Sequence, residues 1–253
     1  MWNLSIHSLY AAMFFALTTW ASADMTYNDG ETHLLSTDIG LNGYVYDDAL
    51  GNATTVNIET GGVVTQHFSA YDDSQILLNG GNIDYDYLGY DNSFITATSG
   101  SVGHNLYLYN NAFADISDIN IGGWLGALDD SKITLSGGNI DLVLISQGHI
   151  DMYGGVVGGT IWASSGDIII YGTDFNMPYG TVMLNEGLIT GILENGDTMY
   201  NLFEISSGGS ITLVESISVD PAIVPTPSAL ILGTIGLGMA GWLKRKRMAC
   251  LQP

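Results

Sequence analysis

The sequence contains little cysteine and few basic residues. Its single cysteine, Cys250, lies near the C-terminal end, so one chain cannot build a disulfide framework. Five Lys and Arg stand against 26 Asp and Glu, and four of the five form the run 244–247, which leaves Lys132 as the only other base. The chain before the run has a formal charge of about −25 (26 acids minus one Lys). Such a charge repels phosphate backbones, which excludes nucleic acid as a partner and favours cations or cationic polymers.

Proline and charged residues are also scarce, whereas glycine and apolar residues are abundant. The chain has 5 Pro and 33 Gly, and it is 12% charged and 46% hydrophobic. Disordered chains have low hydrophobicity, so this composition predicts a folded protein. Short apolar runs separated by Gly, Asn, Asp and Ser predict many short strands joined by turns.

The N-terminal segment is typical of a signal peptide. Residues 4–20 are apolar and lead into Ala21-Ser22-Ala23, which Asp24 follows. Small residues at the first and third positions before the cut are what signal peptidase requires, and the apolar run is short for a membrane anchor. The start departs from the usual pattern because it carries His7 but no Lys or Arg. We expect residues 1–23 to be removed by cleavage between Ala23 and Asp24.

The C-terminal segment, residues 221–253, combines three short features in a fixed order. A proline motif is followed by an apolar stretch at 229–243, expected to form a transmembrane helix, and then at once by the basic run 244–247. Here the chain resembles the PEP-CTERM sorting signal of Gram-negative bacteria, also known as the ice-binding protein C-terminal domain. The motif has Thr where Glu is commoner in that family. Its residues are Val224, Pro225, Thr226, Pro227, Ser228 and Ala229, and the basic residues are Lys244, Arg245, Lys246 and Arg247.

Each part of this tail has a physical role. The prolines keep the motif extended and readable by a protease, the apolar helix holds the tail in the inner membrane, and the basic run stays cytoplasmic. The resemblance implies cleavage near the prolines by an exosortase-type peptidase, after transient anchoring in the inner membrane. It also implies transfer to the cell surface, the outer membrane or an extracellular matrix. The alternative is a plain C-terminal anchor that is never cut.

The middle of the chain repeats with a period of 19 residues. Residues 74–92 and 131–148 share the cores ILLNGGNID and ITLSGGNID. Four columns of apolar residues keep register at steps of 19, with later steps of 17 or 18. The columns are Val64, Ile83, Val102, Ile121, Ile140, Val157 and Phe175; Phe68, Tyr87, Leu106, Leu125, Leu144, Ile161 and Tyr179; Ile76, Ile95, Ala114, Ile133, Ile150 and Ile168; and Leu78, Ala97, Ile116, Leu135, Met152 and Ile170.

These columns predict an all-β fold, a parallel β-solenoid (β-helix) of about seven coils over residues 55–185. The last two columns are two residues apart, which is strand alternation, and Gly-Gly pairs such as 80–81 and 137–138 follow as sharp corners. The competing fold is an antiparallel sandwich or barrel. Such a fold needs no column of like residues at fixed spacing, so the columns favour the solenoid. Residues 24–54 are expected to form an N-terminal cap or an irregular first coil. Residues 186–220 are expected to form a C-terminal β cap.

A polar corner recurs at the same period. Stacked Asp and Asn oxygens could bind calcium, which prefers hard oxygen ligands. The alternative is a solvated row of turns, because Asp and Asn are good turn formers. The pairs are Asp72-Asp73, Asp91-Asn92, Asn110-Asn111 and Asp129-Asp130, and the calcium ligands would be Asp72, Asp73, Asp91, Asp129 and Asp130.

Beside the corner, Tyr71, Tyr90 and Tyr109 also stand 19 residues apart. Stacked tyrosines could offer a platform for sugars. A ladder of aromatic rings that stabilises its own sheet is the other interpretation, and it is the one that the spacing favours.

Signatures of the common enzyme classes are incomplete. Polysaccharide lyases with a β-helix resemble one another in using Arg or Lys to take a proton, and here Lys132 stands alone before the tail. The related hydrolases resemble one another in a set of short motifs. In this chain Asp129-Asp130 and Gly148-His149 match two of those motifs, while the Arg-x-Lys motif is missing. No catalytic residue is therefore assigned. The histidines share no metal-ligand spacing and are interpreted as surface or turn residues; they are His33, His67, His104 and His149.

The leading hypothesis is a non-enzymatic, structural or adhesive protein of the cell surface or extracellular matrix. Its expected partners are signal peptidase and an exosortase-type peptidase during export, with exopolysaccharide or cations as candidates afterwards. The alternative is a protein that binds or degrades polysaccharide. Ice binding is a third option, but the one Thr-x-Thr, at 96–98, is not repeated in neighbouring coils.

Overall fold

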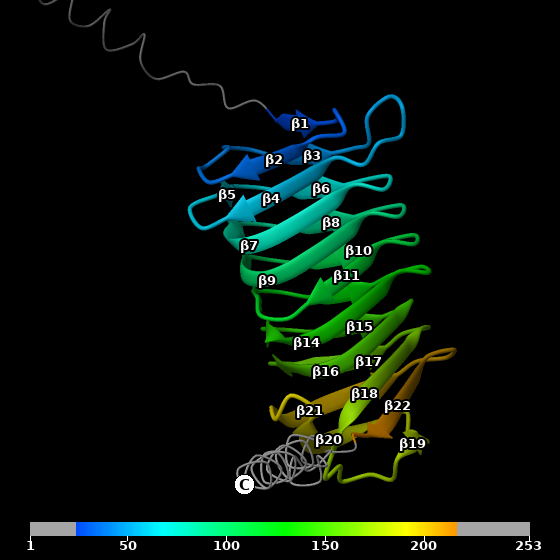
Figure 1. Ribbon diagram of the computed structural model, residues 1–253. Helices are drawn as coiled ribbons and strands as arrows, with labels where there is room; N and C mark the ends of the chain where they lie inside the picture. Colours follow the sequence, from blue (N-terminus) through cyan, green and yellow to red (C-terminus); the bar gives the residue numbers. More distant parts are fainter. Residues whose placement is uncertain (1–23, 217–253) are drawn as a thin grey trace, which may run out of the picture. The chain divides into compact units, whose positions relative to one another are not determined.

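The computed structural model describes residues 24–216 (Figure 1). Within this range the protein is all-β, and its strands stack as a parallel β-solenoid of about eight turns. No helix long and apolar enough to cross a membrane occurs among residues 24–216. The predicted signal peptide, the sorting motif, the apolar helix 229–243 and the basic run 244–247 lie outside the described residues.

The first ladder consists of short strands, each of which pairs in parallel with its counterpart in the next coil. In chain order these strands are β1 (Met25–Tyr27), β3 (Gly43–Val45), β6 (Phe68–Ala70), β8 (Tyr87–Gly89), β10 (Leu106–Leu108), β13 (Leu125–Ala127), β15 (Leu144–Ser146), β17 (Thr160–Ala163) and β21 (Thr198–Ile205).

The second ladder contains the longer strands, again paired in parallel. They are β2 (Thr32–Leu35), β4 (Thr55–Glu59), β7 (Gln75–Ile83), β9 (Phe94–Val102), β11 (Phe113–Ile116), β14 (Lys132–Ile140), β16 (His149–Val157), β18 (Asp167–Thr173) and β22 (Ser210–Glu215).

A third, short ladder closes each coil. It is formed by the ends of β7, β9, β14 and β16 together with β5 (Val63–Val64) and β12 (Asn120–Ile121). The long strands bend at glycines where this ladder begins: Gly80 and Gly138 both have φ of +96°. A residue with a Cβ is strained in that conformation, so the predicted Gly-Gly corners have a backbone reason.

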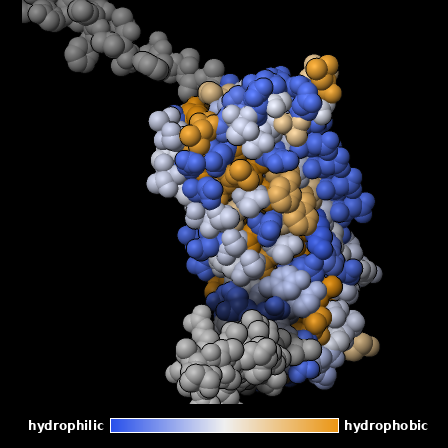
Figure 2. Space-filling model, in the orientation of Figure 1, coloured by the Kyte–Doolittle hydropathy of each residue, from blue (hydrophilic) through white to orange (hydrophobic). Residues whose placement is uncertain are grey.

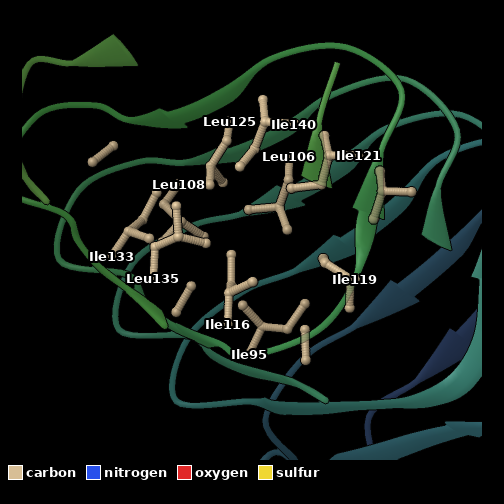
Figure 3. Close-up of a cluster of buried hydrophobic side chains, with 14 of the residues drawn as sticks. Ile95, Leu106, Leu108, Ile116, Ile119, Ile121, Leu125, Ile133, Leu135 and Ile140 are labelled. Atoms are coloured by element: carbon tan, nitrogen blue, oxygen red, sulfur yellow. The ribbon is translucent and has the colours of Figure 1, made fainter. Parts of the chain in front are cut away.

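The four apolar columns are confirmed by the register over most of their length. Ile76 pairs with Ile95 and Tyr87 with Leu106, each one coil apart. Because alternate residues of a strand face opposite sides, every column points into the same interior. Figure 3 shows ten labelled side chains of this core, from Ile95 to Ile140, converging inside the coil. They are buried, so the coils share one continuous core.

Two column positions are wrong. The residue stacked on Ile161 is Phe203, whereas Tyr179 is 44% exposed. Phe175 lies outside the strands, and although it packs against the core it is only partly buried. The chain leaves the stack after β18, where Asp174 adopts a left-handed φ of 54°. It returns only with β21, so constant spacing cannot be extended through this excursion.

The two ends of the described stack differ. At the N-terminal end, β1 and β2 pair in parallel with the second coil, so residues 25–35 belong to the stack. At the other end, β21 and β22 continue the first two ladders. Only β19 (Gly180–Thr181) and β20 (Glu186–Leu193) pair antiparallel and act as a cap: β19 pairs with β22, and β20 pairs with β21 and with the end of β18.

Candidate functional site

The polar corner joins the first ladder to the second, at the loops on the right of Figure 1. Its first residue repeats one backbone conformation: φ is 56° at Asp72, Asp91 and Asn110 and 55° at Asp129. Asp and Asn tolerate this left-handed region better than other residues with a Cβ. The backbone therefore selects these residue types without any ligand. Figure 2 shows hydrophilic residues stacked along the same edge.

Amide groups link the carboxylates of this corner from coil to coil. Asn92 Nδ2 donates to Asp73 Oδ1 at 3.0 Å, and Asn110 Nδ2 donates to Asp91 Oδ1 at 3.0 Å. The backbone N–H of Asn110 donates to Asp129 Oδ2 at 3.2 Å. The asparagines of the middle coils thus reduce the repulsion that a pure aspartate row would suffer.

The row begins at a partly buried carboxylate. Asp47 lies one coil before Asp72, and its Oδ1 is buried without a hydrogen-bond partner. Burial raises the pKa of Asp47, although a backbone hydrogen bond from Asp73 opposes this, and the charges of Asp73, Asp72 and Asp48 raise it further. Sequence spacing missed Asp47 because the loop 47–53 lengthens this coil.

The structure brings the five predicted calcium ligands onto one edge but spreads them along the stack: Asp91 lies one coil after Asp72 and Asp73, and Asp129 and Asp130 lie two coils further on. Among residues 24–216, no group of three or more His, Cys, Asp or Glu converges to hold a metal ion. Calcium binding therefore stays a prediction, and the hydrogen-bonded row of turns is the alternative.

A thermal melt separates these interpretations. Bound calcium predicts that a chelator lowers Tm at low salt by several degrees, since a ligand that binds only the folded state stabilises it. Changing Asp72, Asp91 and Asp129 to Asn would then abolish the dependence. Because Asn keeps the left-handed turn, the triple variant itself should fold. A wild-type melt that ignores the chelator contradicts calcium binding.

The tyrosines beside the corner form a ladder. Ring centroids are 4.6 Å apart for Tyr46 and Tyr71, 4.9 Å for Tyr71 and Tyr90, and 4.9 Å for Tyr90 and Tyr109. The interplanar angles are 6°, 7° and 10°. Stacked rings cover one another's faces, which are the surfaces a sugar would need, so this row stabilises its own sheet. Tyr46 was missed because it stands 25 residues before Tyr71.

Three histidines lie in two carboxylate clusters, and His33 Nε2 contacts Asp29 Oδ1 separately at 2.8 Å. Asp86 lies between His104 Nδ1, at 2.9 Å, and His67 Nδ1, at 3.3 Å. In the second cluster Asp151 contacts Lys132 Nζ at 2.8 Å and His149 Nε2 at 3.2 Å. His149 lies within β16 and His33 within β2, so of the interpretation as surface or turn residues the turn part is wrong for these two.

The Asp151 cluster neutralises the one base of the described residues. Burial alone would raise the pKa of Asp151, but the hydrogen bond from Lys132 and the charges of His149 and Lys132 outweigh it and lower that pKa. The Tyr171 hydroxyl also donates to Asp151, at 3.3 Å. Lys132 is thus committed to an ion pair, which leaves it poorly suited to take a proton from a substrate.

A different surface lies where β17, β21 and β20 run side by side near the end of the stack. Glu204 stands between Trp162 of β17 and Glu186 of β20, in register with both. Tyr200 and Leu202 project from the same side of β21 and are 73% and 62% exposed. We call this surface the Glu186–Glu204 face. The antiparallel pairing that brings the two glutamates together has no periodic signal in the sequence.

Two open hollows mark the Glu186–Glu204 face. One of about 410 Å³ is lined by Thr160, Glu186, Gly187, Leu202, Phe203 and Glu204. The other, of about 440 Å³, is lined by Gly158, Gly159, Thr160, Leu188, Tyr200 and Leu202. They share Thr160 and Leu202, so they adjoin each other.

Comparison with known proteins gives no relative of this chain: no protein-family model, no curated protein and no solved structure matches it. Function has to be inferred from the fold and its surfaces.

Proposed function

We propose that this chain is an exported, non-enzymatic structural or adhesive protein of the cell surface or extracellular matrix. The observation that supports this most is the charge on a rigid stack. Residues 24–216 contain 25 acidic residues (26 less Asp220) and one base, Lys132, which is already paired with Asp151. A rod of this kind stays hydrated, attracts cations and repels anionic polymers.

The continuous core supports a structural role. Each coil is paired on both sides along the stack, so the rod has no exposed strand edge except at its ends. Such a fold resists local unfolding while it presents repeated surfaces to solvent, which is what a surface or matrix element requires.

Export and sorting form the second part of the proposal. The signal peptide 1–23 directs the chain to secretion, and the tail 221–253 holds it in the inner membrane until an exosortase-type peptidase cuts near Pro225 and Pro227. Removal of the run 244–247 would leave a protein whose only base among Lys and Arg is Lys132.

A double substitution tests the sorting step. Changing Pro225 and Pro227 to Ala should leave an uncut precursor in the inner membrane, because the extended motif that the peptidase reads would be lost. Immunoblotting of fractionated cells of the native host measures it. The matched control changes Pro178, which lies outside the tail, to Ala and should be processed normally. Equal processing of all three proteins would contradict recognition of the proline motif.

A further inference from the structure

The Glu186–Glu204 face contains two like charges that the protein itself does not compensate. Glu186 and Glu204 are direct partners in the antiparallel pair of β20 and β21, and both are exposed. Directly opposed residues have Cβ atoms about 4.5–5.5 Å apart, where like charges destabilise a sheet. None of the ion pairs among residues 24–216 includes either glutamate. A cationic group between them would remove the repulsion.

The surroundings of the two carboxylates suit a flat, partly apolar ligand. The two adjoining hollows of the Glu186–Glu204 face extend from the glutamates past Leu202 to Tyr200. The side chains of Leu202 and Tyr200 are more exposed than apolar groups usually are. Gly158 and Gly159 line the far hollow together with Tyr200. A pyranose ring places its C–H groups on such a surface while its polar substituents reach carboxylates at the edge.

Other partners fit less well. A second copy of this chain or an anionic glycan would bring more negative charge to a surface that already repels it. An extended peptide usually adds to a free strand edge. The strand β21, which supplies Tyr200, Leu202 and Glu204, is already paired with β17 and β20. A peptide therefore cannot pair its backbone with β21.

We propose that the Glu186–Glu204 face binds a polysaccharide that carries free amino groups, a polymer of amino sugars. An ammonium group lies between Glu186 and Glu204, and the adjoining sugar rings pack on Leu202 and Tyr200. This inference rests on the proposed function, in which the protein works among surface polymers, and it identifies the polymer class.

Binding of glucosamine oligomers tests the proposal. The full-length chain, purified in mild detergent, is titrated by calorimetry with a β-1,4-linked glucosamine hexamer at low salt and about pH 5.5, where glutamates are ionised. We expect the N-acetylated hexamer to bind at least about tenfold more weakly, because its amides carry no charge. Changing both Glu186 and Glu204 to Gln should weaken binding of the amino hexamer by about tenfold or more. Tyr200→Ala should weaken it about threefold to fivefold.

A matched control separates this face from general attraction to an acidic protein. Changing Asp115 and Asp118 to Asn removes the same two charges at exposed positions of another coil, and we expect a change below about twofold. The variant with both glutamates changed should melt no lower than wild type, because a repulsion is removed.

Three results would overturn the proposal. The first is that the acetylated hexamer binds as tightly as the amino hexamer. The second is that the Asp115/Asp118 variant loses as much affinity as the Glu186/Glu204 variant. The third is that oligolysine binds as tightly as the amino hexamer and that Tyr200→Ala loses no affinity for the amino hexamer. None of them bears on export, which the tail variants test separately.

Discussion

Deletion of one whole coil, residues 93–111, should give a shorter protein that still folds. The deletion joins Asn92 to Ala112, so Ala114 would stack on Ile76, and Leu125 on Tyr87. These residues already occupy the same two columns. Because each coil contacts only its neighbours, we expect a cooperative melt with Tm within roughly 5 °C of wild type.

The matched control removes residues 93–102, about half of a coil. Every later column would then be out of register with the earlier ones, and apolar residues would face solvent. We expect loss of the cooperative transition and of most strand signal in circular dichroism. Equal damage from the two deletions would contradict the stacked-coil architecture.

Replacement of Tyr87 should be the most damaging single change in the core. Tyr87 is completely buried and is among the largest side chains of the interior. Truncating a buried aromatic residue to Ala costs about 3–5 kcal/mol of unfolding free energy. For a domain of this size that lowers Tm by roughly 6–20 °C. Urea denaturation of Tyr87→Ala measures the loss.

Two controls isolate the contribution of packing. The Tyr87 hydroxyl is buried without a well-formed hydrogen bond, so burial raises its pKa and Tyr87→Phe should be neutral or slightly stabilising. Tyr85 is 47% exposed, so Tyr85→Ala should cost no more than about 1 kcal/mol. A loss below about 1 kcal/mol for Tyr87→Ala would show that the core is not closed at this coil.

The repeats could be predicted from the sequence because the coil length is nearly constant there. A parallel stack turns a fixed spacing into direct contact, which is why Ile133 and Ile150 could be aligned without a structure. The same rule fails where a coil changes length. The loop 47–53 hid Tyr46 and Asp47, and the excursion after β18 misplaced Phe175 and Tyr179.

The surface sites were less predictable than the core. The acidic corner was predicted because its Asp and Asn residues recur every 19 positions, in the four coils that share the left-handed turn, but the asparagine bridges depend on side-chain geometry. The cluster at Asp151 joins residues from three coils, and no motif links Lys132 to Tyr171. The Glu186–Glu204 face depends on an antiparallel pair of strands. In such a pair the number of residues between two partners decreases toward the turn, so the paired residues have no constant spacing in the sequence.

The most direct test of the proposed function is the identity of the mature ends of the native protein. Mass spectrometry of the protein from the surface or matrix of its own host should find an N-terminus at Asp24. It should find a C-terminus near the motif 224–229, without Lys244–Arg247 and without Cys250. Surface protein that retains Cys250 would contradict the sorting proposal and indicate a permanent anchor.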